Sequence, residues 1–302
     1  MSVEIYVASH RQVNIELPSC YKLVQVNAKK RGELWKGFIH DDSGENISEK
    51  NESYCELTAV YWGWKNSSAE IKGLNHYRRY FSANENPILT GSKAISTQMI
   101  KDLCLQEDRM IADLSEYDII LQMPYIPYPS TAGEDLTKYC YEKDVEKLTE
   151  VIREKFPEYE NAYFSVMQGK NLSYCNMLIA KREIFDAYCE WLFSVLEAVE
   201  ERCDISNYDP QHKRLFGYLA EVLLNVYVQK HQLKAKYYTP LYVESFDKKE
   251  TSLKHMIHAG NVALFNVLEK TNVKLLEFVA SKYKKAMYDR YLHCKQYLEQ
   301  KD

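Results

Sequence analysis

The residues of this chain best suited to bind phosphate follow a short apolar segment, residues 71–75. That segment has the length and composition of a buried strand, and His76, Tyr77, Arg78 and Arg79 come directly after it. Loops at the carboxyl ends of strands in an open α/β sheet often bind ligands. Two guanidinium groups there suit a diphosphate, because each directs a fork of N–H donors at phosphate oxygens. The alternative is that the two arginines form a solvated surface pair.

A helix is predicted shortly before this strand. Tyr54, Leu57, Tyr61 and Trp64 recur at steps of three and four residues, which places them on one helix face. Ser53 and Glu56 have the spacing of a capping box, so we expect the helix to begin there. Exposed N–H groups at a helix N-terminus favour an anion. Lys50 and Asn51 precede the predicted start and are candidate anion contacts, although both residues also suit a simple cap.

The rest of the chain predicts an α/β fold. Residues 3–8 alternate into an apolar run that ends at Ser9 and His10, which is typical of the first strand of a nucleotide-binding sheet. The other expected strands are 21–26, 117–121 and 172–179, with an extended segment at 237–243. The expected helices are 97–108, 136–156, 181–202 and 214–231, with one or two tail helices at 261–300. Residues 27–46 are interpreted as a long loop, and three prolines make 124–129 a stiff one.

Composition narrows the classes of protein. A formal charge of −4 argues against general nucleic-acid binding, which needs a basic surface. The eight cysteines form no C-x-x-C pair, so reduced thiols in the cytoplasm are expected rather than disulfides or a zinc site. The chain shows neither a leader peptide nor a run of eighteen apolar residues. Residues 261–302 carry eight Lys and Arg against five Asp and Glu, so this tail is a candidate for peripheral contact with the inner face of a membrane, with a solvated helix as the alternative.

Several motifs, in order along the chain, resemble one protein family. They are Ile-Tyr-Val-Ala-Ser-His at 5–10, Asp-Ser-Gly-Glu-Asn-Ile-Ser-Glu-Lys-Asn at 42–51, Tyr-Cys-Glu-Leu-Thr-Ala-Val-Tyr-Trp at 54–62, Gly-Leu-Asn-His-Tyr-Arg-Arg-Tyr-Phe at 73–81, Asn-Met-Leu-Ile at 176–179, Tyr-Cys-Glu-Trp-Leu-Phe at 188–193 and Arg-Leu-Phe-Gly-Tyr-Leu-Ala-Glu at 214–221. This set resembles the domain-of-unknown-function family 4422 over roughly residues 3–230.

The resemblance implies a fold and an activity. Members of that family are regarded as glycosyltransferases of bacterial capsule, exopolysaccharide and O-antigen synthesis, some of them galactofuranosyltransferases. It implies a GT-A-like α/β domain with a central mixed, mostly parallel sheet flanked by helices, here residues 1–235. An extended segment and helical C-terminal tail, residues 236–302, would follow. The implied substrates are a UDP-sugar donor and a lipid-linked or growing glycan acceptor.

Under this resemblance the candidate residues take roles in an inverting glycosyl transfer. The carboxylates proposed for catalysis are Asp209, Glu221 and Glu56, with Asp118 and Asp204 as further candidates for the base. The proposed donor contacts are Ser9, His10, Lys50, Asn51, His76, Tyr77, Arg78 and Arg79, and the proposed acceptor contacts are Tyr174, Asn176 and Arg214. Glu221 also fits a second interpretation, as the buried partner of Arg214.

No metal site is predicted. Many GT-A enzymes hold Mn²⁺ or Mg²⁺ with an Asp-x-Asp motif, which this sequence lacks. The nearest substitutes are Glu116-Tyr117-Asp118 and Asp41-Asp42, so a divalent ion stays open as a cofactor. We expect His76 and the two following arginines to supply the positive charge instead.

Two alternative functions fit the sequence less well. A non-catalytic component of a polysaccharide assembly complex would bind a nucleotide sugar or a glycan without reaction, which suits the 25 tyrosines. A phosphoryl-transfer enzyme would need a P-loop or a metal site, and the sequence provides neither.

Overall fold

The computed structural model describes residues 1–83, 100–124 and 130–243. Its contacts divide the chain into two compact units. Among the described residues, the first comprises 1–13, 18–77, 106–124 and 130–237, and the second comprises 14–17, 78–83, 100–105 and 238–243. The predicted domain boundary after residue 235 stays a prediction, and the expected tail helix at 261–300 lies outside the described residues. No helix within the described ranges is long and apolar enough to cross a membrane.

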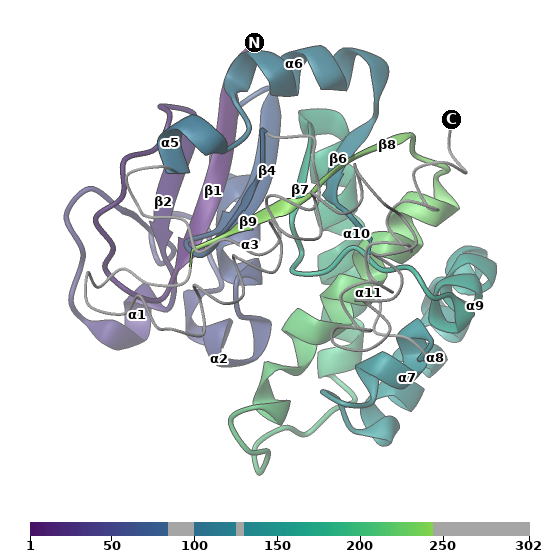
Figure 1. The fold of residues 1–302 in the computed structure, drawn as a ribbon. Helices are drawn as coiled ribbons and strands as arrows, with labels where there is room; N and C mark the ends of the chain where they lie inside the picture. Colours follow the sequence, from purple (N-terminus) through teal and green to yellow (C-terminus); the bar gives the residue numbers. More distant parts are fainter. Residues whose placement is uncertain (84–99, 125–129, 244–302) are drawn as a thin grey trace, which may run out of the picture. The chain divides into compact units, whose positions relative to one another are not determined.

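The first unit is built on a mixed sheet flanked by helices, which confirms the predicted fold class. The strands, in spatial order, are β3 (Ile39–His40), β2 (Tyr21–Gln25), β1 (Val3–Ser9), β4 (Ile71–His76), β7 (Leu178–Lys181), β6 (Ile119–Gln122) and β8 (Ala235–Tyr238) (Figure 1). The β3, β2, β1 and β4 strands are parallel, whereas β7 runs antiparallel to both β4 and β6. Ile5, Tyr6 and Val7 of β1 are completely buried, as expected of a strand covered on both faces.

Strand register brings four segments to one edge of this sheet. Ala8 pairs with His76, so β1 and β4 end side by side. Leu178, the first residue of β7, pairs with Leu74 on one side and Leu121 on the other. The carboxyl ends of β1, β4 and β6 therefore lie at the same edge as the loop that leads into β7.

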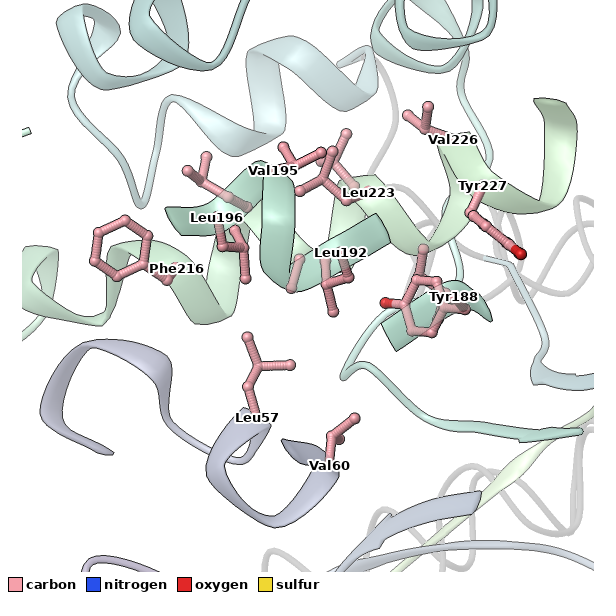
Figure 2. Packing of buried hydrophobic residues seen from close by; sticks show 14 of the residues in the cluster. Leu57, Val60, Tyr188, Leu192, Val195, Leu196, Phe216, Leu223, Val226 and Tyr227 are labelled. Carbon is pink, nitrogen blue, oxygen red and sulfur yellow. The ribbon is translucent and has the colours of Figure 1, made fainter. Parts of the chain in front are cut away.

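Helices cover the sheet, some packed directly on its strands and others on neighbouring helices. They are α1 (Ala28–Arg31), α2 (Asn51–Tyr54), α3 (Leu57–Asn66), α6 (Glu107–Glu116), α7 (Ala132–Leu136), α8 (Glu142–Lys155), α9 (Glu160–Gln168), α10 (Arg182–Glu200) and α11 (Leu215–Lys230). Figure 2 shows Leu57 and Val60 of α3, Leu192 and Leu196 of α10, and Phe216 of α11 in one apolar layer, all at most 1% exposed. Each such side chain contributes roughly 1.5–3 kcal/mol by leaving water, so this layer fixes α11 against α3.

The second unit holds a small antiparallel pair. Its strand β5 (Arg79–Phe81) pairs with β9 (Pro240–Tyr242), with Tyr80 opposite Leu241. Its helix α5 (Ile100–Leu103) falls within the predicted helix 97–108.

Several predicted elements differ in the structure. The predicted loop 27–46 contains α1 and β3. The predicted helix 97–108 is α5 followed by the first residues of α6, and the predicted helix 136–156 is divided between the end of α7 and α8.

The helix expected from Ser53 does not begin at a capping box, because α2 ends at Tyr54 and Cys55 takes φ 52° and ψ −128° before α3 begins at Leu57. Ser53 Oγ donates instead to the Lys50 carbonyl. The expected strand 172–179 begins only at Leu178, because Cys175 and Asn176 have positive φ angles that a strand does not allow. The proline loop at 125–129 lies outside the described residues.

Candidate active site

Seven residues from four segments meet at this carboxyl edge of the sheet. Glu56 comes from the α2–α3 junction, His76 from the end of β4, Tyr174, Cys175 and Asn176 from the loop before β7, and Arg214 and Glu221 from the start and second turn of α11. We call these residues the edge cluster. It contains six residues that the sequence predicted for the site, and Cys175 was not among those predictions.

Asn176 joins three of the four segments. Its side chain is 1% exposed. Its Nδ2 donates to Glu56 Oε1 at 2.8 Å and to the carbonyl of Gly217 on α11 at 3.1 Å. Both bonds hold the residue in a left-handed conformation with φ 52°. Asn tolerates that conformation better than most residues, which explains the residue type.

Cys175 is fixed from both ends of its peptide. Its N–H donates to Glu221 Oε1 at 2.9 Å, and its carbonyl lies 2.7 Å from His76 Nε2. A carbonyl only accepts hydrogen bonds, so the His76 proton in this bond sits on Nε2. The Glu221 carboxylate and the His76 imidazole are thus both fixed in position by hydrogen bonds to the backbone of Cys175.

Cys55, Arg214 and Gly217 form the contact between the α2–α3 junction and α11. Arg214 Nε donates to Cys55 Sγ at 3.3 Å. A Cβ on Gly217 would lie 3.2 Å from both Cys55 Cβ and Cys55 Sγ, so a larger residue would crowd this contact. Burial raises the pKa of the Cys55 thiol to about 12, with Glu56 adding to the effect and Arg214 opposing it. Cys55 is therefore a neutral thiol at physiological pH and a poor nucleophile.

Tyr174 and Ser173 anchor the other end of the loop. Tyr174 Oη donates to Asp135 Oδ2 at 2.6 Å, and burial together with this bond raises the pKa of Tyr174 well above its usual range. Ser173 exchanges two backbone bonds with the Asn225 side chain, at 2.9 and 3.0 Å. Tyr174 thus acts mainly as a support in this structure.

The edge cluster concentrates backbone strain. Among the described residues, positive φ outside glycine occurs at Asn27, Cys55, Cys175, Asn176 and Gln232. Three of these five belong to or touch the edge cluster. Such conformations cost on the order of 1–3 kcal/mol each and gather at functional sites. Single-sequence patterns do not report φ angles, so this signal was invisible in the sequence.

Ser9, His10 and Tyr77 lie at the same edge as His76. The His10 Nε2 and Tyr77 Oη atoms are 3.3 Å apart in a hydrogen bond, and the two rings meet edge to face at 5.0 Å. Ser9 Oγ donates to the Arg11 carbonyl at 2.6 Å. These residues lie near His76 because β1 and β4 pair in parallel register, and their role as donor contacts stays a prediction.

Lys50 and Asn51 bind within the protein. Lys50 Nζ pairs with Glu200 at 2.6 Å. Asn51 Nδ2 donates to the Cys55 carbonyl at 2.6 Å and to Thr58 Oγ1 at 3.0 Å. In this structure Asn51 supports the unusual turn at Cys55, and the donor role of both residues stays a prediction.

Asp209 lies outside the edge cluster, in the loop before α11. Its Oδ2 is 2.5 Å from His212 Nδ1, and its Oδ1 accepts from the N–H groups of Gln211 and His212. The bond from His212 is the main cause that holds the pKa of Asp209 below its usual value. The carboxylate is half exposed and is turned toward its own loop.

Arg78 and Arg79 belong to the second unit. Arg78 Nε donates to the Val243 carbonyl at 3.1 Å, and the Arg79 guanidinium lies 6.0 Å from the Tyr242 ring centre. Their role as diphosphate contacts stays a prediction from the sequence.

The carboxylates suggested as metal ligands have other partners. Asp41 is completely buried and accepts four bonds, from the N–H groups of Asn27 and Ala28 and from the hydroxyls of Ser48 and Thr58. Asp118 accepts from the Lys234 N–H at 2.7 Å. Both carboxylate oxygens of Asp41 already accept hydrogen bonds from internal donors, so this residue does not fit the role of a metal ligand. Within residues 1–83, 100–124 and 130–243, no group of three or more His, Cys, Asp or Glu is placed to hold one.

Comparison with solved structures finds similarity to the apo structure of WbbM, described as a bifunctional glycosyltransferase. The two chains share 29% sequence identity with a TM-score of 0.72, over 81% of this chain and 46% of that chain. This chain thus spans less than half of WbbM. A search of curated proteins found no match.

Comparison with protein-family models finds one family whose model matches most of the chain. Residues 4–232 match the family model described as Domain of unknown function (DUF4422). This range includes every residue of the edge cluster and corresponds closely to the range of the resemblance noted in the sequence. The chain belongs to the DUF4422 family.

Proposed function

We propose that this protein is a glycosyltransferase. It transfers a hexose, such as galactofuranose, from a UDP-sugar to a lipid-linked or growing glycan during capsule, exopolysaccharide or O-antigen synthesis. The observation that carries the proposal is the similarity to a glycosyltransferase over 81% of the chain at a TM-score of 0.72. The strained edge cluster at the carboxyl ends of β1, β4 and β6 supports it, since α/β sheets bind ligands there.

The proposed reaction inverts the anomeric carbon. The acceptor hydroxyl oxygen forms a bond to that carbon while the bond from the carbon to the diphosphate oxygen breaks. The hydroxyl proton passes to a carboxylate, and UDP leaves with the electron pair of the broken bond. Such a step needs a base near the acceptor and positive charge or donors near the diphosphate.

Glu221 is the proposed base. Its Oε1 is fixed by the Cys175 N–H at 2.9 Å, which orients the carboxylate. Glu56, whose Oε1 accepts from the Asn176 amide at 2.8 Å, is assigned to the sugar hydroxyls. Asp209 is not retained as the base in this proposal, since both of its oxygens hold the loop.

The remaining candidates keep binding roles in the proposal. Arg78 and Arg79 contact the donor diphosphate, and the exposed Arg214 contacts the acceptor. No metal ion takes part in this scheme. The protein acts at the cytoplasmic face, where nucleotide sugars and lipid-linked acceptors meet.

Release of UDP tests the proposal. The intact protein is incubated with a panel of UDP-hexoses, and UDP is measured over hours. A transferase hydrolyses its donor slowly even without acceptor, so one sugar should give UDP above the rate without protein. A component that only binds nucleotide sugars would shift its melting temperature with a donor and release none, and that result would refute the proposal.

A further inference from the structure

Two exposed tyrosines stand in the turn between α7 and α8. Tyr139 and Tyr141 are each 40% exposed, among the most exposed large apolar side chains of the described residues. Cys140 between them is buried, so the turn is anchored and the two rings emerge on either side of a fixed point. Exposure of aromatic rings to water is unfavourable in free energy, so a ligand that covers these rings gains binding free energy.

Each tyrosine is paired with a second ring from the start of α11 or the loop before it. Tyr139 lies 5.2 Å from Tyr218, centre to centre, with an angle of 32° between the rings. Tyr141 stacks on His212 at 4.1 Å and 7°. The result is two ring pairs next to each other, which we call the aromatic track: Tyr139 with Tyr218, and Tyr141 with His212.

Asp209 positions the second ring pair. It accepts from His212 Nδ1 and, at 3.4 Å, from Tyr141 Oη, while the N–H groups of its own loop fix its other oxygen. The Tyr208 ring meets Tyr141 edge to face at 4.9 Å. The two rings cover each other on one face and are held in place without a ligand, which lowers the entropy that binding on their other faces would otherwise cost.

The aromatic track continues from the edge cluster. The Arg214 guanidinium lies 5.1 Å from the centre of the Tyr218 ring and also donates to Cys55 beside Glu56. Starting at Glu56, the order is Arg214, then the pair of Tyr139 and Tyr218, then the pair of Tyr141 and His212. Any chain-like ligand that reaches the edge cluster along this surface meets two ring pairs in succession.

We propose that the aromatic track binds successive hexose rings of the acceptor glycan. Hexoses present C–H groups on their faces, which lie well on aromatic rings, and hydroxyls around the rim, which bond to groups such as Tyr Oη, carboxylate and guanidinium. The track carries both signs of charge, negative at Asp209 and positive at Arg214 and Lys143, so it favours a neutral glycan with polar groups on its rim over a polyanion. This inference rests on the proposed transferase function and assigns the surface that holds the acceptor.

Saturation-transfer NMR on the intact protein tests the proposal directly. The probes are maltohexaose, cellohexaose and a galactan hexasaccharide at millimolar concentration. At least one should receive saturation from the wild-type protein, and Tyr139→Ala and Tyr141→Ala should each weaken its affinity about tenfold, the size expected for one lost stacking contact. Tyr141→Phe keeps the ring and should keep most of the affinity. Tyr139→Leu keeps apolar area without a flat face and should behave like the alanine variant.

Tyr117→Ala is the matched control, because Tyr117 precedes β6 at the opposite edge of the sheet and is half-buried. It should bind every probe as the wild type does. Absence of saturation transfer from all probes, or equal affinity in the wild type and both alanine variants, overturns the proposal. UDP release from the donor is measured in parallel with the wild-type protein and without acceptor. If UDP is released but the alanine variants bind glycan as tightly as the wild type, the proposal for the aromatic track fails and the proposed transferase function stands.

Discussion

At the scale of single residues, the backbone of the edge cluster and its contacts is strained at three positions, and hydrogen bonds hold each of them in place. Cys55, Cys175 and Asn176 adopt backbone conformations that cost on the order of 1–3 kcal/mol each. Fixed partners hold all three: Asn51 on the Cys55 carbonyl, Glu221 on the Cys175 N–H, and Glu56 with the Gly217 carbonyl on the Asn176 amide. The two carboxylates of the proposed site, Glu56 and Glu221, therefore also hold the loop before β7 in place.

The first prediction concerns Asn176. Asn176→Ala removes two hydrogen bonds and places a residue without a polar side chain at φ 52°, so we expect a loss of about 3 kcal/mol in the free energy of unfolding. Asn176→Gly loses the same bonds but suits the backbone, so it should cost about 1 kcal/mol less. Urea unfolding measures both. Gln232→Ala is the control, because Gln232 is exposed with a similar φ of 51°. Equal losses for the alanine and glycine variants of Asn176 would contradict the strain at this position.

The second prediction concerns the thiols. Burial raises the pKa of Cys55 to about 12 and that of Cys203 only to about 11. At pH 9 the thiolate fraction of Cys55 should be about tenfold smaller, so iodoacetamide should alkylate Cys203 first, as followed by peptide mass spectrometry. The folded pKa of Cys55 exceeds its ordinary value of 9.0, so its neutral form stabilises the fold below pH 9 and this contribution disappears as the pH rises toward 12. Faster alkylation of Cys55 in the native protein would contradict the burial described.

At the scale of elements, the site depends on how closely α11 approaches the α2–α3 junction. The apolar layer of α3, α10 and α11 sets the distance. Gly217 then allows contact with Cys55, since a Cβ there would lie 3.2 Å from the Cys55 side chain. The same helix carries Arg214 and Glu221, so a displacement of α11 moves both.

The third prediction uses this contact. Gly217→Ala should destabilise the fold by about 1–2 kcal/mol, because crowding against Cys55 exceeds the gain in helix propensity of about 1 kcal/mol. Cys55→Gly removes both crowding atoms and suits φ 52°. The double variant should therefore recover most of the loss, which gives a favourable coupling energy in a double-mutant cycle of urea midpoints. Additive effects of the two changes would show that the contact does not limit helix packing.

At the scale of the whole molecule, the proposal assigns the donor diphosphate to two arginines, Arg78 and Arg79, and the acceptor hydroxyl to one carboxylate, Glu221. The candidate metal ligand Asp41 has four internal donors, and the sequence has no Asp-x-Asp motif. Positive side chains are therefore assigned the role that a divalent ion has in many related folds.

The fourth prediction follows from that assignment. UDP release should persist after dialysis against EDTA, and Mn²⁺ or Mg²⁺ should change its rate less than twofold. Arg78→Ala and Arg79→Ala should each weaken UDP binding in calorimetry by at least tenfold, since charge-assisted bonds contribute roughly 1.5–3 kcal/mol. Lys236→Ala, a cation near Tyr117, is the control and should bind UDP normally. A strict metal requirement with unchanged affinity in both arginine variants would remove this assignment.

Much of the fold was predictable from the sequence, and the reason is periodicity. Apolar runs located β1, β2, β4 and β6, and the amphipathic stripes located α10 and α11 within a few residues. The site was predictable only in part. Glu56, Asn176, Arg214 and Glu221 were named from motifs, but the bonds between them depend on φ angles at Cys55 and Cys175 and on long-range packing, which local patterns do not encode. Asp209 was named as a base because loop carboxylates reach open sites, and its bond to His212 was not visible in the sequence.

The most direct test of the central claim is the turnover of UDP-sugar by Glu221→Gln compared with Glu56→Gln. Glutamine at 221 still accepts the bond from the Cys175 N–H, so the loop and the melting temperature should be preserved while the base is lost. We expect kcat for transfer to fall by about 10²–10⁴-fold in Glu221→Gln, and Glu56→Gln mainly to raise KM. A Glu221→Gln protein that is folded and transfers sugar at the wild-type rate would contradict the account.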